Sequence, residues 1–116
     1  MKEENKIRDL SKVFALRIVK MYQHLLGYKD ISPISKQVLR SGTSIGANIS
    51  ESIYAQSRAD FVNKLSIALK EASETEYWLE LLHDSGYLTD NEYQSIIADN
   101  KYIIGTLVNI IKSSKD

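Results

Sequence analysis

A chain of 116 residues is long enough to bury a core without covalent crosslinks, and this one contains no cysteine. That composition excludes a disulfide framework, a thiolate nucleophile and a cysteine-based zinc site, and it fits a reducing compartment. The net charge is zero, but residues 1–40 carry nine basic and four acidic side chains, or +5, while the remainder carries six and eleven, or −5. Such an asymmetry indicates either a basic face for an anionic partner or complementary faces within an assembly.

The N-terminal segment has acidic residues where a secretory signal has a basic start and an apolar centre. No apolar run approaches the roughly 20 residues needed to cross a bilayer. We therefore expect a cytoplasmic protein without a membrane partner, built as one domain over residues 1–116.

Residues 5–26 are predicted to form the first helix, because apolar side chains recur there at steps of three and four. Gly27 follows at the position of a glycine cap. Ser32 and Pro33 predict the start of a second helix, with the serine as cap and the proline in the first turn. This helix is expected to run to about residue 55, with Ile53 facing inward.

The second helix carries Gly42 and Gly46 beside the apolar positions Ile45 and Ile49. Each mid-helix glycine costs about 1 kcal/mol relative to alanine, so two of them indicate a close helix–helix contact. Asn48 lies at the margin of the same apolar stripe. We interpret it as a residue that fixes how this helix packs rather than as a ligand contact.

Residues 59–85 are predicted to form a third helix with two apolar stripes. The main stripe faces the core, and Ser85 and Gly86 end the helix. The second stripe has heptad-like spacing and is a candidate oligomer interface: Ile67, Glu71, Glu74, Trp78 and Leu81. The alternative is that Trp78 only covers an edge of the bundle.

The fourth helix opens with a capping box, in which Thr89 and Glu92 satisfy each other's backbone amides. Nothing in the sequence has the alternation of a strand. Four amphipathic segments with short connections predict an all-α fold, an antiparallel up-down-up-down four-helix bundle.

No catalytic or cofactor-binding pattern accompanies these helices. Glu80 and His83 match one Glu-x-x-His pair of di-iron bundles, but His24 lacks the glutamate needed for a second pair. The serines of the second helix have no base or oxyanion site in evident reach. We expect no metal, no cofactor and no enzymatic activity.

Three segments together resemble a known family: residues 44–51, SIGANISE, residues 61–82, FVNKLSIALKEASETEYWLELL, and residues 86–88, GYL. They are similar to the 23S ribosomal RNA intervening-sequence proteins, bacterial four-helix bundles related to the accessory variability proteins of diversity-generating retroelements. The resemblance implies a homopentamer and, in the related proteins, binding of nucleic acid and a reverse transcriptase through basic surface. Gly46 stands where the family usually has proline, and Ser52 where it usually has glycine.

Two functional hypotheses follow. The first is a homo-oligomeric bundle that binds RNA or DNA or acts as a ribonucleoprotein scaffold. Its candidate nucleic-acid contacts are the basic residues of the first two helices: Lys6, Arg8, Lys12, Arg17, Lys20, Lys36 and Arg40. The second is a protein-only adaptor that recruits a protein partner through the Trp78 stripe or the acidic surface of the last two helices.

Overall fold

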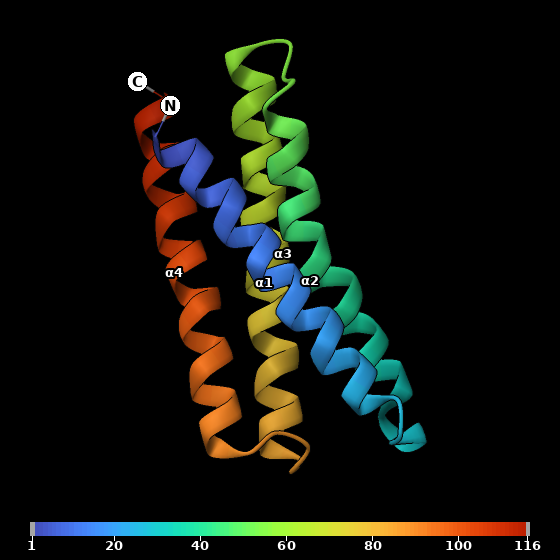
Figure 1. Ribbon diagram of the computed structural model, residues 1–116. Helices are drawn as coiled ribbons and strands as arrows, with labels where there is room; N and C mark the ends of the chain where they lie inside the picture. Colours follow the sequence, from blue (N-terminus) through green and yellow to red (C-terminus); the bar gives the residue numbers. More distant parts are fainter. Residues whose placement is uncertain (1, 116) are drawn as a thin grey trace.

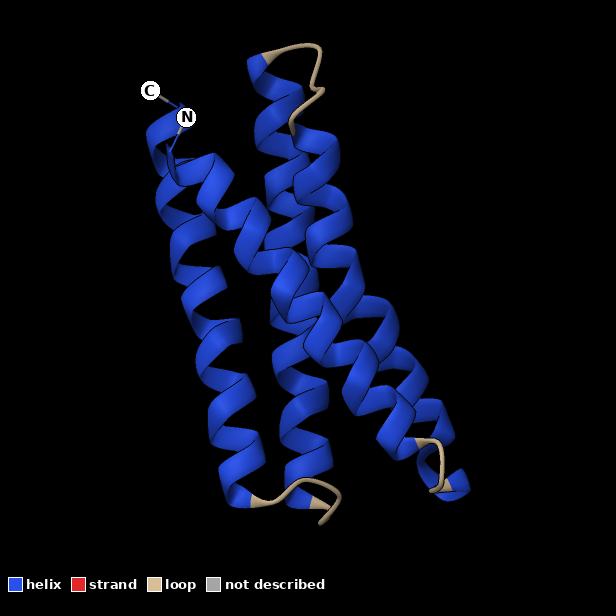
Figure 2. Ribbon diagram, in the orientation of Figure 1, coloured by secondary structure: helices blue, strands red, loops and turns tan. Residues whose placement is uncertain are grey.

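The apolar spacing of the four predicted segments is realised as four helices packed side by side (Figure 1). The computed structural model describes the backbone of residues 2–115 and the side chains of residues 5–115. The helices are α1 (Lys2–Leu25), α2 (Ser32–Ser52), α3 (Arg58–Asp84) and α4 (Asp90–Lys115), with a short 3₁₀ turn, η1 (Lys29–Ile31), before α2. No strand occurs within the described residues (Figure 2).

Each helix runs antiparallel to the next, so the all-α up-down-up-down prediction is confirmed. α2 packs against α1 and α3, α3 packs against α4, and α1 closes the ring onto α4. The contact between α1 and α4 is the least extensive of these, and α1 lies obliquely to α4 (Figure 1). Surface grooves are therefore expected beside α1.

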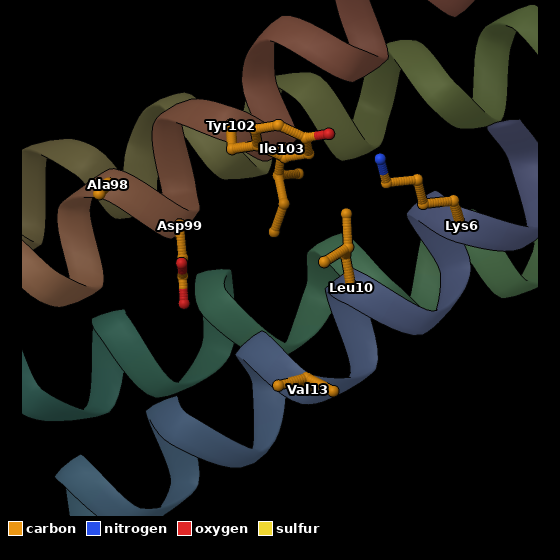
Figure 3. Close-up of a pocket in the computed structure, with 7 residues that line it drawn as sticks. All are labelled: Lys6, Leu10, Val13, Ala98, Asp99, Tyr102 and Ile103. Carbon is orange, nitrogen blue, oxygen red and sulfur yellow. The ribbon is translucent and has the colours of Figure 1, made fainter.

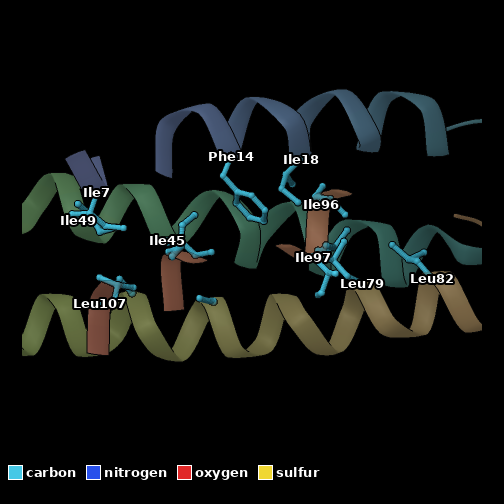
Figure 4. Packing of buried hydrophobic residues seen from close by; sticks show 14 of the residues in the cluster. Ile7, Phe14, Ile18, Ile45, Ile49, Leu79, Leu82, Ile96, Ile97 and Leu107 are labelled. Atoms are coloured by element: carbon cyan, nitrogen blue, oxygen red, sulfur yellow. The ribbon is translucent and has the colours of Figure 1, made fainter. Parts of the chain in front are cut away.

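The core receives side chains from all four helices (Figure 4). Phe14, Ile45, Leu79 and Leu107 are at most 1 % exposed and fill its centre. Burying a large apolar side chain contributes about 1.5–3 kcal/mol, so this shared core is the main stabilising contribution to the bundle.

Buried polar side chains interrupt the core where α2 and α4 face α3. The hydroxyls of Ser41 and Thr75 lie 2.9 Å apart, and Thr75 also reaches the carbonyl of Glu71 in its own helix at 2.8 Å. Asn100 is fully buried and donates from Nδ2 to the carbonyl of Ala72 at 3.0 Å. The periodicity alone did not single out these residues, although each occupies a position on an apolar stripe.

Three expectations about the helix ends are wrong. Gly27 is not a left-handed cap, because Gly86, with φ of +91°, is the one described residue with positive φ; the chain instead enters η1 after a Tyr28-to-Leu25 backbone bond. Ser32 is the first residue of α2, whose N-cap is Ile31 without a side-chain bond. Ile53 follows the end of α2 and is 45 % exposed rather than inward.

The starts of α3 and α4 are held by side-chain caps. Ser57 Oγ accepts a hydrogen bond from the amide of Asp60 at 3.0 Å, a cap that was not predicted from the sequence. The predicted box at α4 is confirmed. The amide of Glu92 donates to Thr89 Oγ1 at 3.1 Å, and the amide of Thr89 donates to the Glu92 carboxylate at 2.8 Å.

Candidate nucleic-acid interface

A polar groove of about 500 Å³ runs between α1 and α2. Arg8 and Lys12, one helical turn apart on α1, form one wall, and Thr43, Ala47 and Ser50 of α2 contribute to the other. Of the seven predicted nucleic-acid contacts, these two cations are the pair that the structure brings to one groove. Arg8 lies 3.8 Å from Asp9, an exposed ion pair that solvent screens strongly.

Two glycines of α2 lie where α1 packs closely against it: Gly46 lines the groove, and Gly42 packs against Ile18 outside it. A Cβ on Gly42 would lie 2.8 Å from Ile18 Cγ1, so α1 and α2 could not approach as they do with any larger residue there. A Cβ on Gly46 would lie 3.4 Å from the Ser11 carbonyl oxygen, an ordinary contact. Asn48 donates to the carbonyl of Ser44 at 2.8 Å, a bond within its own helix.

Arg40 points away from this groove and joins α2 to α3. Its guanidinium is 3.3 Å from the Glu71 carboxylate and also contacts Glu74. Hydrogen bonding to Glu71 and the negative charges of both glutamates raise the pKa of Arg40. This side chain is therefore engaged within the chain.

Two further cations, Arg17 and Lys6, lie toward α4, and Figure 3 shows Lys6 on this side of α1. Arg17 Nη1 is 2.6 Å from Asp99 Oδ2, and its Nη2 donates to the Ser95 hydroxyl at 2.9 Å. Lys6 Nζ lies 5.4 Å from the centre of the Tyr102 ring. Neither cation therefore lines the α1–α2 groove: Lys6 lines a groove with Tyr102, and Arg17 lines a separate recess with Met21.

Lys12, Lys20 and Lys36 are exposed and form no ion pair with another described residue. The seven basic residues therefore do not form one patch in a single chain. They divide among the α1–α2 groove, the α1–α4 side and the outer surfaces of both helices. The separation arises because residues 8 and 12 lie on one side of α1 and residues 6 and 17 on the other.

The second stripe of α3 lies on the side that faces α2. Glu71 and Glu74 accept from Arg40, and Trp78 is half-buried against the core. Ile67 is 36 % exposed and Leu81 is half-buried. Part of this stripe is used within the chain, and its role as an oligomer interface stays a prediction.

His83 lies at the hairpin between α3 and α4. Its Nε2 is 2.6 Å from Asp90 Oδ1, and its ring stacks on Tyr93 with centroids 4.2 Å apart. Glu80 is exposed. Within the described part of the chain, no three His, Cys, Asp or Glu side chains gather as metal ligands would. None of the described helices combines the length and apolarity of a membrane span.

These features define a class: an antiparallel four-helix bundle with a polar groove on one side of α1 and an apolar groove on the other. Residues 3–109 match the model of the family described as 23S rRNA-intervening sequence protein. The chain belongs to that family, which confirms the resemblance noted in the sequence.

Comparison with solved structures gives the same result. A crystal structure of a protein of unknown function from the S23 ribosomal protein family of Bacteroides thetaiotaomicron is 55 % identical, with a TM-score of 0.91. The match covers 95 % of this chain and 98 % of the other. No curated protein shows significant similarity to the chain.

Proposed function

We propose that this protein is a non-catalytic homo-oligomer that binds RNA through the α1–α2 groove. The observation that carries the proposal is the pairing of Arg8 and Lys12 along one wall of a polar groove with a floor of small residues. Cations in a row attract phosphates, and a floor without bulky side chains lets a nucleic-acid backbone approach closely. The family's description names an intervening sequence of 23S ribosomal RNA, which favours RNA over DNA.

The chemistry of the groove favours recognition of the backbone rather than of base sequence. Lys12 and the exposed Ser50 can donate to phosphate oxygens. The Thr43 hydroxyl already donates to the carbonyl of Leu39 at 2.7 Å, and no aromatic side chain lines the groove on which a base could stack. Binding should therefore depend on RNA charge and shape.

Assembly would strengthen this weak single-chain site. With two cations in each groove, one copy offers few phosphate contacts, whereas several copies would engage one RNA simultaneously. The family resemblance implies five copies. Exposed apolar side chains on α3, including Ile67 and Tyr77, provide apolar surface that such an assembly could bury.

A salt titration of RNA binding tests the proposal. The probes are a labelled hairpin RNA of mixed sequence and a single strand of equal length, and the measurement is fluorescence anisotropy. We expect the slope of log affinity against log salt to fall by about 2 in R8E/K12E, because two phosphate contacts are lost. The matched control is K70E/K101E, which reverses two exposed lysines of α3 and α4 outside the groove. An equal loss in both variants, or binding that does not depend on salt, would refute the groove. Absence of RNA binding by the wild-type protein would favour the protein-only adaptor.

A further inference from the structure

A second groove, of about 440 Å³, lies on the opposite side of α1, against α4 (Figure 3). Its floor is apolar, with Leu10 of α1 facing Ile103 of α4. Val13 and Tyr102 form its walls and are 57 % and 52 % exposed. The groove exists because α1 and α4 make the least extensive helix contact in the bundle.

The apolar surface continues from the groove onto the outer face of α1. Leu16 is 57 % exposed and follows Val13 by three residues, so the two side chains are neighbours on the helix surface. Together with Leu10 and Tyr102 they form an apolar strip beside the groove. Several adjoining exposed apolar side chains, unlike a single one, are typical of an interaction surface.

The charges along this strip are unevenly compensated. Arg17 pairs with Asp99, Lys6 lies over the ring of Tyr102, and Asp9 has only a weak, exposed contact with Arg8 at 3.8 Å. Lys12 and Lys20 precede and follow Leu16 by one turn each, and neither forms an ion pair with another described residue. The remaining charge beside the strip is therefore positive, which selects an acidic occupant.

We propose that the α1–α4 groove and the adjoining outer face of α1 dock an acidic amphipathic helix of another protein. A groove between two helices accepts the side-chain ridge of a third helix, and apolar anchors at helical spacing would meet Leu10, Val13 and Leu16. Lys12 and Lys20 are eight residues apart, or about 12 Å along the axis. The partner helix therefore carries carboxylates about two turns apart beside its apolar stripe.

This docking site goes beyond the proposed RNA binding and does not depend on it. The two grooves lie on opposite sides of α1, and Lys12, which lines the α1–α2 groove, also lies one turn before Leu16 on the outer face. RNA would need the cations but not the apolar strip, whereas a helix needs both. Substitution of Val13 and Leu16 therefore separates the two proposals.

The probe is a capped peptide of about 18 residues with a leucine stripe and glutamates two turns apart, long enough to form a helix on binding. Its affinity for the full chain is measured by fluorescence anisotropy. A scrambled peptide of equal composition and a peptide with lysine in place of each glutamate are the controls. We expect saturable binding of the glutamate peptide below about 100 µM and weak binding of both controls.

Two variants give the decisive comparison. V13S/L16S should weaken the glutamate peptide about tenfold while leaving RNA affinity unchanged, because both side chains are exposed and uncharged. K12E/K20E should weaken the glutamate peptide about tenfold or more and bind the lysine peptide instead. That reversal of preference is a gain of binding, which a misfolded variant could not show.

Three results would overturn the docking site. The first is a glutamate peptide that binds no better than its scrambled form. The second is a V13S/L16S protein with unchanged peptide affinity. The third is a V13S/L16S protein of reduced molar mass combined with no peptide binding by the wild type, which would mean that a second copy of this chain covers the strip.

Discussion

Glycine has opposite consequences at two positions of this bundle. Gly42 lies on α2 against Ile18, and an added methyl group would overlap the γ-carbons of that fully buried side chain. Gly105 lies on α4, and a Cβ there would have no atom within 4 Å apart from its chain neighbours and the backbone of its own helix. Close packing therefore requires glycine at residue 42. The glycine at residue 105 has no such packing role and only lowers the helix propensity of α4.

The first prediction follows from that contrast. G42A should reduce the free energy of unfolding by about 1–2 kcal/mol, because crowding in a packed interior outweighs the gain in helix propensity. G105A should increase it by about 0.5–1 kcal/mol. Urea unfolding followed by circular dichroism measures both. A stabilised G42A protein would show that α1 can move away from α2 at little cost.

Individual side chains also show where sequence reasoning reaches its limit. The buried polar residues Thr75 and Asn100 are recognisable once helical periodicity is extended through them, because they share faces with Ala72, Leu79 and Ile103. The Oδ1 atom of Asn100 has no partner among the described residues, and leaving a buried acceptor unpaired costs about 1–3 kcal/mol. The spacing of residues along a helix does not show whether a buried polar atom has a hydrogen-bond partner.

The apolar periodicity correctly predicted that all four segments are helices and placed most of their ends within a few residues. Apolar stripes and the Thr89–Glu92 box located α1, α3 and α4 within a few residues. The errors occurred between α1 and α2 and at the end of α2, because Gly27, Ser32 and Ile53 are also compatible with other local geometries. A 3₁₀ turn before α2 replaced the expected caps at Gly27 and Ser32, and two turn residues follow α2 where the helix was expected to continue.

Links between helices could not be predicted. Arg40 bonds carboxylates 31 and 34 residues later in the chain, and Arg17 bonds Asp99, 82 residues away. Which carboxylate each arginine reaches depends on helix rotation and tilt, which are set by core packing. Exposed ion pairs contribute about 0–1 kcal/mol each, so these arginines orient the helices more than they stabilise them.

The cap of α4 gives a pH-dependent prediction. The Thr89 amide donates to the Glu92 carboxylate, and this bond lowers the pKa of Glu92 below its ordinary value of 4.5. Because the pKa is lower in the folded state, the stabilisation is fully present above the ordinary value and is lost as the pH falls through the folded value. E92Q should therefore unfold more easily at neutral pH and lose less stability on acidification.

Urea titrations from neutral pH to about pH 3 measure this effect. T89A, which removes the hydroxyl acceptor, should lower the free energy of unfolding by about 1 kcal/mol at neutral pH. E80Q on the exposed face of α3 is the matched control, because that carboxylate makes no hydrogen bond with another described residue. An E92Q profile parallel to that of the wild type would contradict a carboxylate role in the cap.

At the scale of the whole molecule, the oblique position of α1 produces two grooves of different character. The α1–α2 groove is polar and basic, and the α1–α4 groove is apolar. The charge difference between the two halves of the sequence was compatible with a basic surface around α1 and α2 or with complementary faces in an assembly. Helical spacing separates residues 8 and 12 from residues 6 and 17, but which neighbouring helix each side of α1 faces follows from helix rotation and tilt.

We propose that several copies of this bundle assemble and together hold RNA. The most direct measurement is the molar mass of the purified protein by light scattering, with the ultraviolet absorbance ratio that reports nucleic acid recorded on the same peak. We predict a mass of five times 13.2 kDa for the protein component and a nucleic-acid signal that disappears at high salt. A single species of 13.2 kDa without nucleic acid would contradict the account.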